Sequence, residues 1–307
     1  MIFSMRLLQK PGMHAFCCAI GLGFLLGAHA GVADAQPVQF SDDRGATIRL
    51  AQPARRIITL TPHLTELSFA AGAGTHLAGV ARFSNYPEAA RRLPVVSDSG
   101  QFDPELLLTL KPDLVLAWKN GTPAAVVARL ESIGLPVFVA EFARLEDVAR
   151  GIEAIATLAG TLPVGRRARD AYNAGLRDLR ARRYSDAPVR VFYEIWPQPL
   201  MTVNDTHIIS DVVALCGGVN IFGALRPLTP EVSREALLAA RPEVALGGSS
   251  AETAASFATR WAGLPPPLGA IPAYHIVPDL IQRPTPRLLE GARLVCARLD
   301  AVRAARR

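Results

Sequence analysis

The 307-residue sequence lacks the motifs that identify the common enzyme classes. It contains no Gly-x-Ser-x-Gly nucleophile elbow, no Gly-x-x-x-x-Gly-Lys phosphate loop and no dinucleotide fingerprint. The segment Gly247-Gly-Ser-Ser250 could cradle an anion, but glycine-rich strand exits are common in proteins of every function. No nucleophile can be paired with a base. We therefore expect a protein that binds a ligand, catalyses no reaction and carries no cofactor.

The six histidines are too dispersed to predict a metal site. A Zn or Mn centre needs several imidazoles and a carboxylate that converge on the ion. The candidates His63, His207 and His275 lie far apart in the chain, and no His-rich loop occurs. A position at the start of a helix explains His63 more simply. Metal binding stays an alternative that no spacing supports.

The excess of positive charge is also small. The chain has 33 Lys and Arg and 27 Asp and Glu, which gives a formal net charge of +6. Arginines cluster at 166–183, but they alternate with Ala168, Tyr172, Leu176 and Leu179, which share one helix face. The one aromatic residue among them, Tyr172, lies on this apolar face, so no aromatic residue is placed among the arginines to stack on bases. These observations indicate a solvated helix flank and exclude nucleic acid as the expected partner.

The N-terminus has no apolar run long enough for a comfortable membrane span. Arg6 and Lys10 precede an apolar stretch at 15–28, and small residues follow at Ala33-Asp34-Ala35. This order of basic, apolar and small-residue segments is typical of a cleaved secretory signal. We therefore predict a signal peptide at residues 1–35 and an exported, soluble mature chain.

Cysteine is scarce too, because cleavage of the signal would leave only Cys216 and Cys296 of the four in the chain. In an oxidising compartment, such a pair is expected to form a disulfide. The bridge would close a loop of about 80 residues and stabilise the fold by about 4 kcal/mol in the chain-entropy model. Two buried thiols are the alternative.

Short apolar runs that alternate with helical patterns fill the rest of the chain. This order predicts parallel sheets covered by helices on both faces. The first lobe, 36–144, has strands at 77–80, 95–96, 114–117 and 137–140 and helices at 104–110 and 123–133. The second lobe, 187–307, has strands at 189–195, 244–246 and 274–277 and helices at 207–215, 233–240 and 285–299.

Between the two lobes the pattern is helical only, with one interruption at Gly160 and Pro163, and we predict a bridge at 145–186. The stretch from Val164 to Arg183 would extend about 30 Å as a helix. That length is enough to connect one lobe to the other.

Two stretches, one in each lobe, repeat a single pattern. They begin at Pro104-Glu105 and at Arg234-Glu235, and each continues with an apolar helical turn, a base-Pro-acid step and an apolar run. Duplicated units fold alike, so each lobe would carry one Glu on a matching surface. Such a pair favours docking over chemistry. The alternative is that helix-Pro-strand junctions recur in any α/β protein.

Six segments in order resemble the periplasmic cobalamin-binding proteins of ABC importers, within a group that also carries siderophores and haem. They are Ile58-Thr-Leu-Thr-Pro-His-Leu-Thr-Glu-Leu67, Phe83-Ser-Asn-Tyr-Pro87, Leu110-Lys-Pro-Asp-Leu-Val-Leu-Ala-Trp118, Cys216-Gly-Gly-Val-Asn-Ile-Phe222, Val232-Ser-Arg-Glu235 and Pro286-Arg287. The resemblance covers about 55–298. It implies two α/β lobes with mainly parallel sheets, joined by one long rigid helix, and cobalamin bound between them with little closure. It also implies a periplasmic monomer that docks onto the permease dimer of an inner-membrane importer.

The resemblance assigns roles to particular residues. Glu105 and Glu235 match the carboxylates that dock onto permease arginines, and Cys216 and Cys296 match the family's disulfide. Phe83, Trp118 and Trp196 are predicted to contact the ligand, as is the loop Asp279-Leu280-Ile281-Gln282-Arg283, through its backbone and its arginine.

Ordinary roles remain open for several of these residues. Either Glu could be a first-turn acid that favours the helix dipole, and core packing is the alternative for Trp196 and Phe102. The chain also departs from the family pattern. The loop 226–231 lacks an aromatic residue, and Ser99 stands near the position of a family Trp. A related corrinoid, haem or a ferric siderophore therefore stays open as the ligand.

Overall fold

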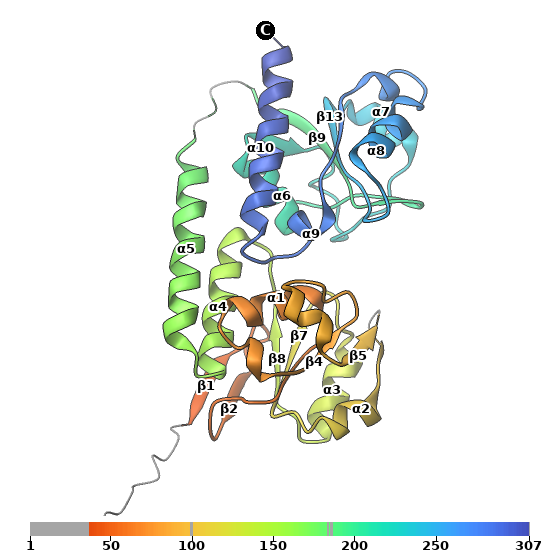
Figure 1. Cartoon of the computed structure of the whole chain (residues 1–307). Helices are drawn as coiled ribbons and strands as arrows, with labels where there is room; N and C mark the ends of the chain where they lie inside the picture. Colours follow the sequence, from red (N-terminus) through yellow and green to blue (C-terminus); the bar gives the residue numbers. More distant parts are fainter. Residues whose placement is uncertain (1–36, 99–100, 183, 185–186, 307) are drawn as a thin grey trace, which may run out of the picture. The chain divides into compact units, whose positions relative to one another are not determined.

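The computed structural model describes residues 37–98, 101–182, 184 and 187–306. The predicted signal peptide, 1–35, and Ser99 lie outside the described residues. Within these ranges no helix is both long and apolar enough to cross a membrane. The two main sheets both belong to the unit Ala35–Arg307 (Figure 1).

The first sheet has six strands in the order β6-β5-β4-β3-β7-β8. All neighbours run parallel except β6, which lies antiparallel at one edge. The strands are β3 (Ile57–Thr59), β4 (Leu77–Ala81), β5 (Val95–Asp98), β6 (Gln101–Phe102), β7 (Leu114–Trp118) and β8 (Val137–Ala140). The runs of β7 and β8 are apolar at every position, as expected where helices cover both faces of a sheet.

Successive strand residues in this lobe point to two different cores. Leu114 and Leu116 face α1 (Pro62–Ala70) and α4 (Leu145–Leu158), whereas Val115 faces α2 (Pro104–Thr109) and α3 (Ala124–Ser132). This alternation is the period-2 geometry of a strand. Two short 3-10 helices, η1 (Gly74–His76) and η2 (Glu88–Arg92), complete the connections.

A hairpin that the sequence pattern did not predict precedes the first sheet. Strands β1 (Val38–Ser41) and β2 (Thr47–Leu50) pair antiparallel, and β1 packs against α4. The ring of Phe40 meets that of Phe138 edge-on, with centroids 6.0 Å apart. The hairpin therefore adds apolar cover to the core of the first lobe.

The second sheet has four strands, all parallel, in the order β12-β9-β13-β14. They are β9 (Val189–Glu194), β12 (Gly218–Asn220), β13 (Val244–Gly247) and β14 (Ala273–His275). Helices α6 (Ile208–Leu215) and α10 (Leu288–Ala305) contribute to the core on one face, and α7 (Arg234–Ala240) and α8 (Ala254–Ala262) to the core on the other. The predicted two-lobed α/β class is confirmed, whereas α8 was not predicted.

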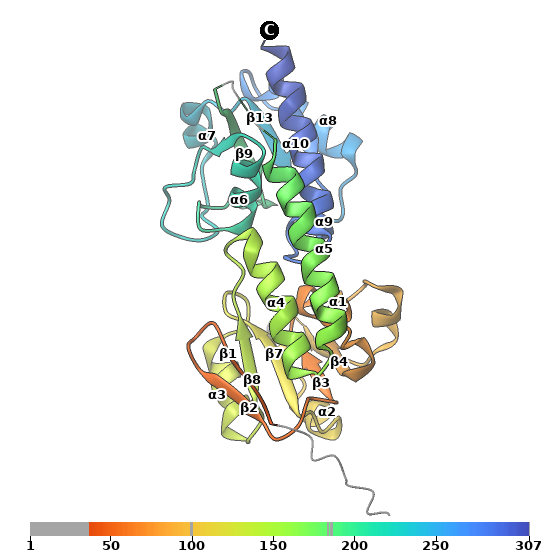
Figure 2. The same cartoon turned by 90° about the vertical axis from the view of Figure 1, so that its left-hand side faces the viewer.

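Two helices fill the predicted bridge, separated at the interruption that the sequence shows at Gly160. After α4 the chain turns at Gly160, and α5 (Leu162–Arg180) runs back beside it (Figure 2). A Cβ at Gly165 would lie 2.3 Å from that of Ala156, so the two helices approach very closely. Tyr172 donates a hydrogen bond of 2.8 Å to the carbonyl of Leu145. The connection is therefore a packed helix pair.

One apolar core extends through both lobes by way of these helices. It includes Ile57 and Leu116 of the first sheet, Leu176 of α5, and Val191 and Leu246 of the second sheet. Helix α10 contributes further buried residues to the same core and packs against α5. The two sheets are thus separate, but their hydrophobic cores are continuous.

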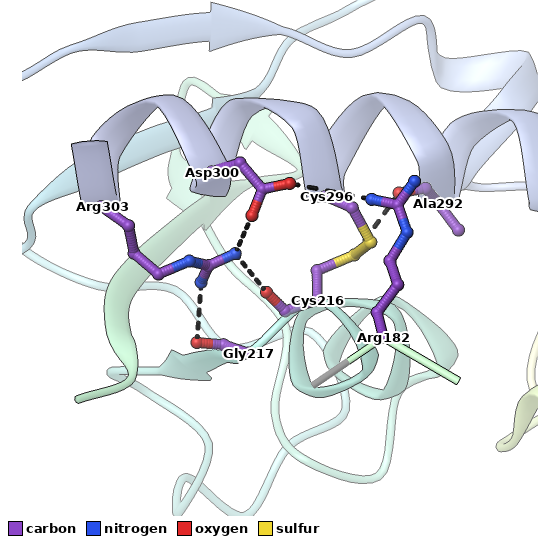
Figure 3. The surroundings of a disulfide bond; sticks show 7 residues. All are labelled: Arg182, Cys216, Gly217, Ala292, Cys296, Asp300 and Arg303. Atoms are coloured by element: carbon purple, nitrogen blue, oxygen red, sulfur yellow. Dashed lines mark hydrogen bonds and ion pairs between the residues drawn. A yellow bond between two sulfur atoms is a disulfide. The ribbon is translucent and has the colours of Figure 1, made fainter. Parts of the chain in front are cut away.

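The predicted disulfide is present and joins the end of α6 to α10 (Figure 3). Cys216 and Cys296 are both fully buried, with Cα atoms 4.6 Å apart. The alternative of two free thiols was therefore wrong. Nearby, the buried Arg303 donates to the carbonyl oxygens of Cys216 and Gly217 and pairs with Asp300, so it satisfies carbonyls at the C-terminus of α6.

The two repeated stretches form junctions that are built alike. In the first lobe Asp113 accepts a hydrogen bond of 2.9 Å from the backbone N–H of Arg56 and returns one to its carbonyl. In the second lobe Glu243 exchanges the same pair of bonds with Arg190. The acid after each proline therefore ties its strand to the neighbouring strand, which explains why the step recurs.

Candidate functional site

A buried polar cluster joins the two lobes, and Glu66 lies at its centre. Glu66 is on α1 of the first lobe, and only 2% of its side chain is exposed. Its Oε1 accepts hydrogen bonds of 2.8 Å from Arg283 and Arg287, and its Oε2 accepts one of 3.0 Å from Arg287. Both arginines belong to the second lobe. One carboxylate therefore holds two guanidinium groups of the other lobe.

Arg283 makes three further contacts from the same guanidinium. Its Nη1 donates to Oδ1 of Asn85 at 2.6 Å, and its Nη2 donates to the carbonyl of Phe83 at 3.2 Å. Its Nη2 also lies 2.9 Å from Oδ1 of Asp279, whose Oδ2 accepts from Asn85 at 3.0 Å. The segment 83–85 is thus fixed to the start of α9 (Pro278–Ile281).

Local backbone features place these groups. Phe83 follows β4 with φ of 65°, a left-handed conformation that is unusual for a non-glycine residue. The turn exposes 68% of its side chain and directs its carbonyl to Arg283. Pro278 at the first position of α9 fixes the entry of that helix, with Asp279 in the first turn.

Arg287 completes the cluster on the side of Tyr86. Its guanidinium lies 4.0 Å from the centre of the Tyr86 ring, which is a cation–π contact. Burial disfavours the charge of Arg287, but its hydrogen bonds to Glu66 outweigh this effect and raise its pKa. Arg287 is therefore charged at every physiological pH.

A cavity of about 400 Å³ opens beside this cluster, with walls from both lobes. It brings together three predicted ligand residues, namely Phe83, Asp279 and Arg283. The remaining lining residues are Asn85, Ser250, Glu252, His275, Val277 and Pro278. The cavity lies at the carboxyl ends of β13 and β14, where ligands of parallel α/β sheets bind.

The Gly247-Gly-Ser-Ser250 segment, a candidate anion cradle, already surrounds a carboxylate of its own chain. The backbone N–H of Ser249 donates to Oε2 of Glu252 at 3.0 Å, and Arg260 donates to Oε1 at 2.8 Å. Burial opposes the charge of Glu252, but these bonds outweigh it and lower its pKa. Arg260 also pairs with Glu194, which is 1% exposed. An ion-paired acid therefore forms this wall of the cavity.

Trp118 ends β7 and packs in the first lobe. Its ring meets that of His63 edge-on, with centroids 5.1 Å apart, and His63 meets Phe142 at 5.5 Å. Burial, reinforced by the charge of Arg283, lowers the pKa of His63 to about 3. Trp118 is partly buried and is not among the lining residues of the cavity, so its contact with a ligand stays a prediction.

Trp196 projects from a hairpin of the second lobe, formed by β10 (Trp196–Pro197) and β11 (Leu200–Met201). Its side chain is 53% exposed, and its Nε1 donates to the carbonyl of Gln198 at 2.8 Å. The core-packing alternative therefore does not hold for Trp196. Phe102 is partly buried against the core and lies 5.8 Å from the guanidinium of Arg129.

The predicted ligand loop 279–283 begins as helix α9 and not as an extended loop. Ile281 is fully buried in the core, so only its backbone could reach a ligand. Leu280 is partly buried, and its carbonyl lies where a side chain at Gly291 would clash. The amide of Gln282 lies 3.5 Å from the hydroxyl of Tyr193. Within this segment, Asp279 and Arg283 thus reach the cavity.

Glu105 and Glu235 occupy equivalent positions on the two lobes. Each is exposed in the first turn of its helix, α2 or α7. The residue before each helix caps it, because Asp103 accepts from the N–H of Glu105 and Ser233 from that of Ala236. Neither glutamate is among the cavity residues, which leaves both side chains available to a partner.

Comparison with known proteins agrees with this architecture. A family profile described as "Periplasmic binding protein" matches residues 57–260. The chain belongs to the periplasmic binding protein family. A curated "Vitamin B12-binding protein" of Vibrio cholerae is 36% identical over 250 residues, which is 80% of this chain and 90% of that protein. Its namesake in Yersinia pestis is 32% identical and covers 82% of this chain and 89% of its own length.

Solved structures of the family superpose on most of the chain. The crystal structure of the periplasmic vitamin B12-binding protein of Vibrio cholerae has a TM-score of 0.75 at 35% identity and covers 82% of this chain and 98% of its own. A periplasmic haem-binding protein from Roseiflexus sp. RS-1 has a TM-score of 0.70 at 23% identity, with coverage of 81% and 99%. The latter likeness shows the shared fold alone.

No sequence pattern assigned a role to Glu66, Asn85, Glu252 or Arg287. Glu66 stands in a helix whose other central side chains are buried, and a buried acid requires a partner. That signal could have marked Glu66, but its partners lie more than 200 residues away. No group of three or more metal-ligating side chains occurs among the residues that the structure describes.

Proposed function

We propose that this periplasmic binding protein captures cobalamin between its two lobes and delivers it to an ABC importer of the inner membrane. It is exported to the periplasm, acts there as a monomer and catalyses no reaction. One observation carries the proposal: the chain matches proteins named for vitamin B12 over 90% of their length, at 36% identity. A cavity lined by residues of both lobes also supports the proposal.

The geometry of the site suits a large, flat ligand with polar edges. The exposed rings of Phe83 and Trp196 offer apolar faces from the first and second lobes. Aromatic faces bury much ligand area at small rotamer cost. The cavity itself has room for one edge of such a ligand, and Asn85, Asp279 and Ser250 supply polar groups there.

Titration of the purified mature protein with cyanocobalamin tests this function. We expect saturable heat at micromolar ligand and red colour that stays with the protein after desalting. Hemin and a ferric siderophore serve as competitors. Binding of either competitor together with no binding of cyanocobalamin would assign the protein to that chelate instead.

The importer partner is proposed from the paired glutamates. Two acids on matching surfaces fix the orientation of a twofold-related partner, and complementary charge raises the rate of encounter. Replacing Glu105 and Glu235 together by Ala should leave cobalamin affinity unchanged and reduce uptake by proteoliposomes that contain the importer. Glu290→Ala, in the exposed first turn of α10, is the matched control. An equal loss of binding and uptake would show that the two acids are structural.

A further inference from the structure

From the charges on the walls of the cavity we propose a selectivity rule, which states the ligand groups that the cavity accepts and rejects. The cavity accepts a ligand edge that presents neutral N–H donors and rejects one that presents a carboxylate, and Glu252 is the residue that sets this selectivity. The inference rests on the proposed function. For a corrinoid, it means preference for the amide side chains of cobalamin over the same side chains hydrolysed to carboxylic acids.

Two carboxylates of the second lobe line the cavity. Glu252 precedes α8, and Asp279 lies in α9. Glu252 accepts from the N–H of Ser249 and from Arg260 and also bonds to the side chain of Ser249, and each oxygen of Asp279 has one partner. A carboxylate oxygen has two lone-pair sites. Both groups therefore retain capacity to accept from a ligand.

The cation that lines the cavity is already neutralised. Nη1 of Arg283 donates to Glu66 and Asn85, and Nη2 contacts the carbonyl of Phe83 and the carboxylate of Asp279. Only 12% of the Arg283 side chain is exposed. A ligand carboxylate would have to displace one of these buried partners, which leaves a buried polar group unpaired.

The wider network around the cavity is acidic. Its carboxylates are Glu66, Glu194, Glu252 and Asp279, and its guanidinium groups are those of Arg260, Arg283 and Arg287. Four negative groups thus face three positive ones, and His63 adds no charge because burial keeps it neutral. Arg82 stacks on the ring of Phe83 but pairs with Asp98 and is not a lining residue.

One backbone donor of this wall is also in use. The N–H of Ser249 is held by Glu252, and the carbonyl of Ser249 accepts from Nε2 of His275, because a carbonyl cannot donate. Among the side chains that line the cavity, the hydroxyl of Ser250 and the second amide N–H of Asn85 are neutral donors. A primary amide satisfies such a mixture of neutral donors and acidic acceptors, whereas a carboxylate meets repulsion.

The test compares cyanocobalamin with each of its separated monocarboxylic acids, made by hydrolysing one side-chain amide. Dissociation constants are measured by calorimetry at pH 7.5. We expect at least one isomer to bind the wild-type protein about tenfold or more weakly, because like charges repel at short range. Glu252→Gln should reduce at least threefold the ratio of the dissociation constants of that isomer and of cyanocobalamin, both measured on the variant. Glu153→Gln is the control, since Glu153 pairs with Arg169 outside the cavity.

Binding of every isomer within twofold of cyanocobalamin would overturn the selectivity rule while leaving the proposed function intact. If the ratio of the dissociation constants of the monocarboxylic acid and of cyanocobalamin is unchanged in Glu252→Gln, then Glu252 does not set the selectivity. The wild-type comparison does not depend on the variant folding. Failure of cyanocobalamin to bind would refute the proposed function, and hemin binding in that case would refute the rule as well, because hemin carries two carboxylates. Binding of neither would refute the cavity as a chelate site and the rule with it.

Discussion

Replacement of Glu66 by Ala is expected to destabilise the protein more than the removal of any exposed acid. The change leaves two guanidinium groups, of Arg283 and Arg287, without their shared carboxylate. The side chains of these arginines are 12% and 18% exposed, so water can solvate the unpaired charges only in part. Removing one partner of a buried ion pair costs about 3–5 kcal/mol.

The lower end of that range applies here, because both arginines keep other partners. Arg283 retains Asn85, Asp279 and the carbonyl of Phe83, and Arg287 retains the ring of Tyr86. We therefore expect a loss of about 3 kcal/mol in the free energy of unfolding. At about 2–4 °C per kcal/mol for a chain of this size, the midpoint of thermal unfolding should fall by about 6–12 °C.

Urea denaturation of the mature protein, followed by circular dichroism, measures this loss. The control is Glu153→Ala. The partner of Glu153 is Arg169, which is more exposed than Arg283 and Arg287, so the loss of Glu153 should cost less than about 1 kcal/mol. The double variant Glu66→Ala with Arg287→Ala should lose less than the sum of the two single variants, since it removes both charges of one pair. A loss for Glu66→Ala no larger than that of the control would refute the importance of the buried cluster.

Three further predictions concern covalent, acid–base and ligand contacts. Replacing Cys216 and Cys296 together by Ala opens a loop of 80 residues and should lower the free energy of unfolding by about 4 kcal/mol in urea, whereas an unchanged value would contradict the chain-entropy estimate. His63 has a folded pKa of about 3 against an ordinary value of 6.5, so the unfolded chain binds the proton first. The contribution of neutral His63 to the free energy of unfolding should therefore be complete above pH 6.5. Below pH 6.5 that free energy should fall by about 1.4 kcal/mol per pH unit, and the fall should be smaller in His63→Gln. Phe83→Ala should weaken cobalamin binding about tenfold without a change in midpoint temperature, because the ring is 68% exposed; equal affinity would exclude contact.

Much of the fold could be predicted because its strands are buried on both faces. Runs such as Leu114–Trp118 and Val137–Ala140 are apolar at every position, and prolines and glycines separate them from the helices. The hairpin β1–β2 was missed because each of its strands has four residues, too few for the alternation of apolar and polar side chains to stand out. Helix α8 was missed although Thr253 and Ser256 form a capping box at its start.

The candidate site was only partly predictable. Phe83, Asp279 and Arg283 were assigned from the family resemblance, and the structure brings them to one cavity. The partners of Glu66 could not be assigned, because pairing between lobes depends on how two sheets are placed and not on any local pattern. Glu252 follows the glycine-rich exit of a strand, at 247–250, which the sequence suggested as a cradle for an anion that does not belong to the chain. The chain fills that exit with its own carboxylate.

The apolar core that α4, α5 and α10 share with both sheets restricts how this protein can be recombined with its relatives. A fragment that ends after β8 would lack these helices and leave apolar side chains of the first sheet, such as Leu116, in water. A hybrid that takes one lobe from another family member would have to take all three helices from a single parent. Otherwise it would bury mismatched side chains where the helices pack against the two sheets. Exchange of ligand preference between such proteins is therefore simpler through substitutions in the cavity walls than through transfer of whole lobes.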